Sequence, residues 1–203
     1  MSMKMLTKKT VSVIIVTIIV VAAVSVYLIY PREAKAASFS ENFENGLDNW
    51  VTAGDAPDDP NNPGHPVEWN IELSTNQYVS PSHSALFTID GLQDDGAIWI
   101  ERKLVLEPNS VKSVNVTFQL WSVSESFNTL AVVIGYAGNK NPAVEGDFEV
   151  IGAANQVEGW KTYSFAAEVT ADSNGDAYVA LGISVVWETQ MSYFVDDVTV
   201  DVN

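Results

Sequence analysis

The stretch AIWIERKLVLEPNSVKSVNVTFQLWSV, residues 97–123, decides the fold of this chain. Apolar and polar side chains alternate in 97–106 and in 113–123. Both halves are rich in β-branched and aromatic residues, which is typical of half-buried strands. The connection between them contains Pro108 and Asn109, which favour a turn. The stretch therefore predicts two antiparallel strands joined as a hairpin.

Centring this hairpin near position 110 assigns each side chain to a face, because strand residues alternate sides. One face is apolar except for Arg102, and we expect it to form the core. The other face pairs Trp99 with Trp121 and Glu101 with Gln119. A change of register by one residue would move all of these side chains to the opposite face.

Two indoles beside a carboxylate and an amide are typical of a sugar-binding surface. Flat rings stack on the C–H faces of pyranoses, and the polar groups bind hydroxyls. We expect Trp99, Trp121, Glu101 and Gln119 to bind such a ligand, and Tyr136 and Trp187 are further candidates on neighbouring strands. Alternatively, the two tryptophans pack beneath a loop as a cross-strand aromatic pair.

Similar short runs, separated by turn residues, continue through the rest of the chain after Ala37. They predict strands at 38–44, 67–73, 84–90, 129–137, 148–153, 160–170, 177–187 and 193–202. Without helical periodicity between them, these runs predict an all-β fold, an antiparallel β-sandwich or jelly roll. The segment 52–66 carries four prolines, and we interpret it as either an ordered, ion-binding loop or a mobile one.

The first 36 residues are typical of an export segment. Three lysines precede 11–30, a run without charge, and Ala34-Lys35-Ala36 has the small-x-small form of a signal-peptidase site. The run is also long enough for a helix that spans a bilayer. We expect 1–36 to be a cleaved signal peptide or a retained membrane anchor, and 37–203 to be one extracellular or cell-surface domain.

The domain is strongly acidic. Five of the ten Lys and Arg residues and 25 of the 26 Asp and Glu residues follow position 36, which leaves a net charge of −20. Nucleic acid requires a basic face, so we exclude it as a partner. Cation binding and plain solubility both fit this charge. The chain has no cysteine, so the predicted core, with or without a metal ion, must supply the stability.

Two adjacent carboxylates interrupt the last predicted strand. By alternation Asp196 points to the same side as Val198 and Val200, toward the core, and Asp197 points to solvent. An inward carboxylate must be paired, coordinated or protonated. Three arrangements satisfy this condition: Asp196 binds Ca²⁺, accepts hydrogen bonds from backbone N–H groups, or pairs with Arg102.

Three motifs carry a resemblance to a known family. NFENGLDNW (42–50), YVSPSHSALFTI (78–89) and YFVDDVTV (193–200) resemble the calcium-binding jelly roll of carbohydrate-binding modules, with families four, nine and twenty-two the most similar. The resemblance spans about 38–203, and it implies a β-sandwich that binds a polysaccharide or other glycan.

The resemblance also implies a structural calcium ion that joins the first strand to the last. Glu44 and Asp196 match the acidic ligands, and the loop from Ser80 to His83 would supply a further oxygen. This chain has Pro81 and Ser82 in that loop, where the family often has glycine and sometimes an acid. An ion that binds only the folded state would add stability to a domain without disulfides.

We expect no catalytic activity. The paired acids of jelly-roll glycosidases, a histidine set for zinc and a Gly-x-Ser-x-Gly motif are all missing from the sequence. We therefore predict an exported, non-catalytic carbohydrate-binding domain. The alternative is a cell-surface structural or adhesive protein that self-associates through edge strands. A glycosylation sequon at Asn115 lies on the predicted sugar face, and a glycan there would favour this alternative.

Overall fold

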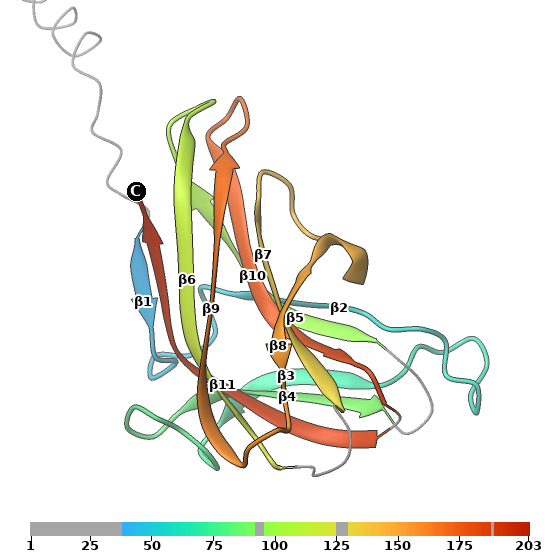
Figure 1. Cartoon of the computed structure of the whole chain (residues 1–203). Helices are drawn as coiled ribbons and strands as arrows, with labels where there is room; N and C mark the ends of the chain where they lie inside the picture. The colour runs from blue at the N-terminus through green and yellow to red at the C-terminus, as the bar shows by residue number, and fades with distance from the viewer. Residues whose placement is uncertain (1–37, 92–95, 125–129, 188) are drawn as a thin grey trace, which may run out of the picture. The chain divides into compact units, whose positions relative to one another are not determined.

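The computed structural model of the chain describes residues 38–91, 96–124, 130–187 and 189–203. The expected signal peptide or anchor, residues 1–36, lies outside these ranges. Within the described ranges, no helix is both long and apolar enough to cross a membrane. These ranges are built from strands, as the alternating pattern predicts (Figure 1).

Two antiparallel sheets pack face to face (Figure 1). Sheet A contains β3 (Trp69–Ser74), β4 (Ser84–Gly91), β11 (Thr189–Val202), β6 (Val111–Ser122) and β9 (Gly159–Thr170) in that order, and β1 (Phe39–Glu41) also pairs with β11. Sheet B contains β2 (Val51–Asp55), β5 (Ala97–Val105), β10 (Asp176–Val185), β7 (Ala131–Gly138) and β8 (Glu149–Ala153) in that order. The predicted antiparallel β-sandwich is confirmed.

The predicted hairpin between 97–106 and 113–123 is wrong in its pairing. β5 pairs with β2 and β10, whereas β6 pairs with β11 and β9, so the two strands belong to different sheets. The alternation of apolar and polar side chains indicates which side chains of a strand are buried. It does not indicate which other strand pairs with that strand. The connection with Pro108 and Asn109 crosses from one sheet to the other.

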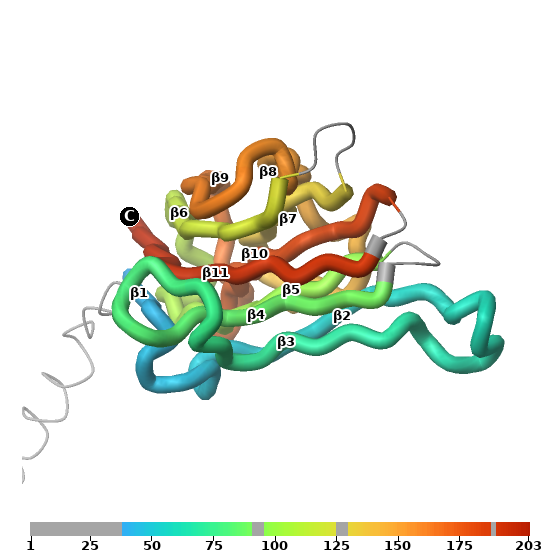
Figure 2. The backbone as a smooth tube through the Cα atoms, turned by 90° about the horizontal axis from the view of Figure 1, so that it is seen from below, coloured from blue at the N-terminus to red at the C-terminus, as the bar shows by residue number. Residues whose placement is uncertain are grey.

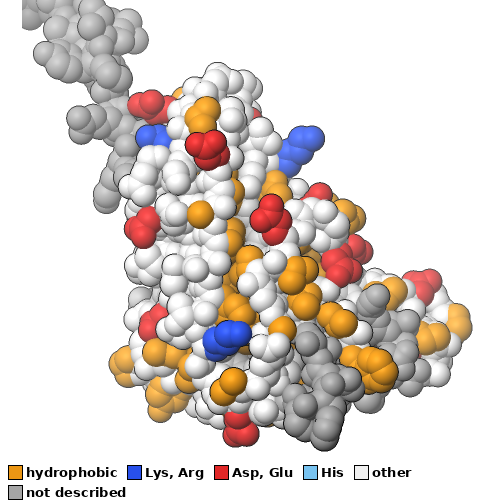
Figure 3. All heavy atoms as spheres, in the orientation of Figure 1, with side chains coloured by type: hydrophobic (Ala, Val, Ile, Leu, Met, Phe, Trp, Pro, Cys, Tyr) orange, Lys and Arg blue, Asp and Glu red, His pale blue; other side chains and the backbone are white. Residues whose placement is uncertain are grey.

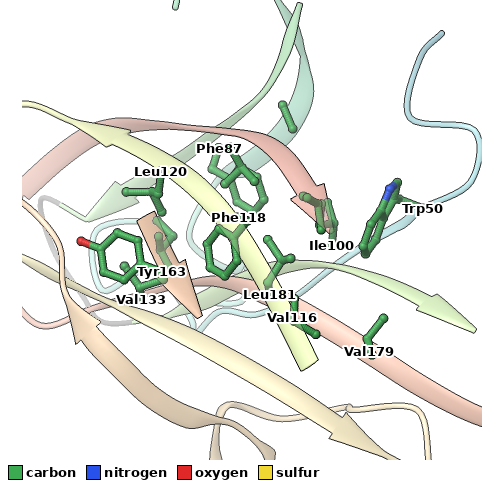
Figure 4. Close-up of a cluster of buried hydrophobic side chains, with 14 of the residues drawn as sticks. Trp50, Phe87, Ile100, Val116, Phe118, Leu120, Val133, Tyr163, Val179 and Leu181 are labelled. Carbon is green, nitrogen blue, oxygen red and sulfur yellow. The ribbon is translucent and has the colours of Figure 1, made fainter. Parts of the chain in front are cut away.

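The core lies between the sheets, and its side chains are those that alternation assigns to the apolar face. Ile100 of β5 and Val116, Phe118 and Leu120 of β6 are buried in one cluster, where they meet across the sandwich rather than along a hairpin (Figure 4). Arg102 lies on the same side of β5 at the end of the core. Its guanidinium stacks over the Phe39 ring at 3.9 Å.

A β-bulge divides β11 into two halves. Val195 pairs with Leu120 and Asp196 with Gln119, but the register shifts before Thr199 pairs with Thr117. Asp197 adopts a left-handed backbone with φ of 49°. One extra residue in a strand reverses the alternation beyond it. β4 pairs with the first half of β11 and β1 with the second (Figure 2).

The proline-containing segment 52–66 begins inside β2, a strand that the sequence pattern did not predict. The remainder forms a turn closed by a bridge between Asp58 and Pro66, and the Asp59 N–H donates to the His65 carbonyl at 2.8 Å. This hydrogen bonding agrees with the ordered alternative. Ion binding by this loop stays a prediction.

Candidate functional site

The predicted metal ligands converge on one loop. Asp196 is fully buried, and its Oδ2 accepts hydrogen bonds from the Val79 N–H at 2.8 Å and the Ser80 N–H at 3.0 Å. Its Oδ1 accepts the N–H of Asp197 at 2.7 Å. The Ser80 hydroxyl adds a longer bond to Oδ1 at 3.4 Å. The carboxylate is therefore satisfied by backbone N–H groups, one of the three arrangements expected from the sequence.

Glu44, which follows β1, binds the other end of the same loop. Its Oε1 accepts the His83 N–H at 2.8 Å, and its Oε2 accepts the Ser82 hydroxyl at 2.9 Å. The His83 Nδ1 lies 3.4 Å from Oε2. We call residues 79–83 the clasp loop, because carboxylates from both ends of the domain attach to it.

The direction of Asp196 is a correction to the sequence analysis. Asp196 pairs with Gln119, which alternates with the core residues Phe118 and Leu120. Asp196 therefore points away from the core, and the clasp loop covers it there. The bulge at Asp197 explains the error, because Val198 turns inward again immediately after it.

The two carboxyl groups differ in their titration. Burial raises the pKa of Asp196, although N–H groups of the clasp loop and of Asp197 oppose this effect. Burial also acts to raise the pKa of Glu44, but the hydrogen bonds from Ser82 and His83 outweigh it, so the pKa of Glu44 is lowered. The alternative in which Asp196 pairs with Arg102 is not the one observed, since an Arg102 guanidinium nitrogen lies 3.8 Å from Glu41 Oε2 instead.

The chemistry of this site does not fit a cation in the arrangement described. N–H and O–H donors face both carboxylates, whereas calcium takes oxygen ligands from carboxylates, carbonyls and hydroxyls. Within the described ranges, no three His, Cys, Asp or Glu side chains are grouped to bind a metal ion. Calcium at Glu44, Ser80, His83 and Asp196 stays a prediction, which requires the clasp loop to turn oxygens inward.

Trp99 and Glu101 lie on the face of sheet B that points away from sheet A. Trp99 is 1% exposed and Glu101 is 4% exposed. Phe148 packs on the indole with ring centroids 4.8 Å apart. Glu101 accepts hydrogen bonds from Trp99 Nε1 at 2.9 Å and from Asn141 Nδ2 at 2.6 Å.

The segment 139–148, including the 3-10 helix η1 (Glu145–Asp147), provides this cover. The Glu145 N–H donates to Asp55 of β2 at 2.8 Å, and the Tyr136 hydroxyl donates to the Lys140 carbonyl at 2.8 Å. The predicted ligand residues Trp99, Glu101 and Tyr136 therefore pack beneath a segment of the chain. Trp99 and Glu101 are too deeply buried to contact a sugar in this arrangement, whereas Tyr136 is half-buried and stays a candidate.

Gln119 and Trp121 lie on the other side of the molecule, on the face of sheet A that points away from sheet B. We call this the outer face of sheet A. Trp121 is half-buried and pairs directly with Trp160 of β9, which is also half-buried. The edge of Trp121 meets the Phe194 ring, with centroids 5.5 Å apart. Gln119 Nε2 donates to the Thr162 hydroxyl at 3.0 Å, two residues along the same two strands and therefore on the same face.

The predicted pairs Trp99–Trp121 and Glu101–Gln119 are thus wrong, since each pair is divided between two sheets. The true cross-strand partners, Trp160 and Thr162, were missed. The signal was present, because Trp160 begins a predicted strand, but strand order cannot be obtained from local alternation. Trp187 is 57% exposed beyond the end of β10, separate from both groups in sequence and sheet position.

Comparisons with known proteins support the fold. No protein-family model and no curated protein matches the chain. Among solved structures, the CBM22-1 xylan-binding domain of Paenibacillus barcinonensis Xyn10C is similar with a TM-score of 0.50 and 14% identity, over 85% of this chain and 97% of that one. The K3 cleaved adhesin domain of the Lys-gingipain of Porphyromonas gingivalis has a TM-score of 0.51 and 14% identity, over 80% and 96%.

The enzymatically active domain of the bacteriophage CBA120 tailspike protein 4 is a weaker match, with a TM-score of 0.49 and 9% identity. It aligns with 78% of this chain, which spans only 20% of that one. At these identities the comparisons show the fold. The chain has the β-sandwich of carbohydrate-binding modules, as the resemblance in sequence implied.

Proposed function

We propose that this protein is an exported, non-catalytic domain that binds a glycan through the outer face of sheet A. The observation that carries the proposal is the Trp121–Trp160 pair next to the hydrogen-bonded Gln119–Thr162 pair. Aromatic rings supply stacking area, and the amide and hydroxyl supply directional bonds to sugar hydroxyls. The fold shared with a xylan-binding domain adds support.

The charge of the molecule restricts the glycan. On the face of the molecule that Figure 3 shows, acidic side chains are scattered, with few basic ones among them. The sequence after position 36 carries 25 acidic and five basic residues. A polyanionic glycan would be repelled, so the proposal is for a neutral one.

Calcium at the clasp loop is a separate hypothesis, which the resemblance in sequence implies. The resemblance to calcium-binding modules supports it, and so does the attachment of Glu44 and Asp196 to one loop. The hydrogen bonds described above argue for a loop that is complete without an ion. The glycan proposal does not depend on the answer, because the aromatic pair lies on β6 and β9.

Retention on polysaccharides tests the glycan proposal. The protein is applied to insoluble neutral polysaccharides beside the variants Trp121→Ala and Trp160→Ala, with Val150→Ala as the matched control. Val150 is exposed on β8 of sheet B, so its loss leaves the outer face of sheet A intact. We expect retention of the protein and of Val150→Ala, and loss in both tryptophan variants. Folded protein that no polysaccharide retains would overturn the proposal and favour the structural or adhesive alternative.

A further inference from the structure

A hollow of about 680 Å³ lies beside the connection between β2 and β3. Its volume falls within the range usual for ligand sites, about 300–1,000 Å³. The side chains around it are mostly polar, and one indole is among them. The lining residues that matter here are Asp59, Asn62, His65, Glu68, Trp69 and Asp90.

The indole in this hollow occupies space that is free because a neighbouring residue is a glycine. Trp69 is half-buried and packs against the main core. A Cβ atom added to Gly54 of β2 would come within 2.9 Å of Trp69 Cε2, so the ring lies directly against the backbone of sheet B. A larger residue at position 54 would displace the indole. The hollow therefore has a fixed aromatic wall.

A second, smaller hollow of about 200 Å³ adjoins the first and shares Glu68, Trp69 and Asp90 with it. It extends onto the outer face of sheet A, where Asn70, Thr88 and Gln190 line it. The two hollows thus form one depression that opens onto the face that carries Trp121 and Trp160.

The register of sheet A connects this depression to the tryptophan pair. Gln190 pairs with Asp90, and Phe194 lies four residues further along β11 on the same face. Phe194 pairs with Trp121, which pairs with Trp160. Asn70 and Thr88 line the depression on this face, and the exposed, polar Ser192 lies on β11 between Gln190 and Phe194. With the usual rise and strand spacing, Asp90 and Trp160 are about 20 Å apart along the sheet.

We propose that the outer face of sheet A binds a single neutral oligosaccharide along its length, with the depression at one end and the Trp121–Trp160 pair at the other. This inference rests on the proposed function and specifies its ligand. One sugar ring is far shorter than the path, so only a chain of several sugars reaches both ends. Three carboxylates line the larger hollow, and no Lys or Arg lines either hollow, which favours neutral chains over uronic acids.

The test is the dependence of affinity on chain length. Titration calorimetry with xylo-, cello- and galacto-oligosaccharides of increasing length is performed on the protein and on the double variant Asn70→Ala/Gln190→Ala. Both residues are exposed, so the variant is expected to fold. The expected affinity of the double variant for the longest chain is lower by about tenfold, as for the loss of two hydrogen bonds. Its affinity for a disaccharide should not change, and Val150→Ala should behave as the wild type.

The outcomes separate the two proposals. Affinity that does not increase with length, or that the double variant leaves intact for long chains, overturns the extended site and leaves glycan binding at the tryptophans. An absence of binding to every oligosaccharide and polysaccharide overturns the proposed function itself. Tighter binding of polygalacturonate than of the neutral chains would overturn the choice of a neutral ligand.

Discussion

The carboxylates of Glu44 and Asp196 bind opposite ends of the clasp loop, one from just after β1 and the other from the bulge of β11. β1 and β4 pair with successive parts of the same edge of β11, and the clasp loop leads directly into β4. Both ends of the domain and an internal loop are thereby joined without a disulfide. The predictions below begin with this arrangement.

Removal of the Asp196 carboxylate should destabilise the protein strongly. The variant Asp196→Ala removes the acceptor of the partly buried Val79, Ser80 and Asp197 N–H groups, and a hydrogen bond to a charged group contributes about 1.5–3 kcal/mol. We expect the free energy of unfolding, measured with urea, to fall by about 3 kcal/mol. Asp197→Asn is the matched control, because asparagine tolerates a positive φ. Equal stability of the two variants would show that the Asp196 bonds contribute little.

Glu44 should make the protein more stable at neutral than at acidic pH. The pKa of Glu44 is lower in the folded state than in the unfolded state. Its contribution to the free energy of unfolding is therefore complete above the pKa of the unfolded state, and it is lost as the pH falls through the pKa of the folded state. The melting temperature of wild type should therefore decrease more between pH 6 and pH 3 than that of Glu44→Gln. The raised pKa of Asp196 acts in the opposite direction in both proteins, so it does not affect the comparison. Parallel curves for the two proteins would contradict the prediction.

Calcium distinguishes the two accounts of the clasp loop. Because N–H and O–H donors satisfy both carboxylates in the arrangement described, we expect the melting temperature to be the same with calcium and with a chelator. A higher melting temperature in calcium, lost in Glu44→Gln and in Asp196→Asn, would instead establish the metal site that the sequence resemblance implies. Magnesium at equal concentration serves as the control for ionic strength.

Glu101 should be important for stability and unimportant for glycan binding. Its two oxygens accept from Trp99 Nε1 and Asn141 Nδ2, and the amide of Glu101→Gln would direct a donor toward one of these donors. We expect a loss of about 2 kcal/mol in unfolding free energy. Retention on polysaccharide at a temperature where the variant is folded should be unchanged. Loss of retention would place the glycan on sheet B.

Trp160, which the sequence analysis did not select, should matter to glycan binding as much as Trp121. Truncation of an aromatic anchor at the centre of a binding surface costs about 2 kcal/mol or more, which is about thirtyfold in affinity. Titration of Trp160→Ala and Trp160→Phe with an oligosaccharide measures this cost, and phenylalanine should restore part of the affinity. Wild-type affinity in Trp160→Ala would exclude the cross-strand pair as the anchor.

Local pattern was sufficient for the strands and for the buried side chains. Alternation identified ten of the strands and the core residues of β5 and β6, because the period of side chains along a strand is a property of the chain itself. It missed β2, where Gly54 and the following prolines obscure the pattern. The set of residues at the clasp loop came from the resemblance in sequence, and the structure brings those residues together.

The sequence by itself determined an acidic, all-β sandwich with a known set of inward side chains, because burial and charge depend on residue type and spacing. Only the tertiary structure decided which strands lie side by side. That order put Trp99 beneath the 139–148 segment and Trp121 beside Trp160. It also placed the bulge that turned Asp196 out of the core and under the clasp loop. Strand pairing joins residues that are far apart in the chain. The free energy of their contacts therefore cannot be obtained from the alternation of side chains within one strand.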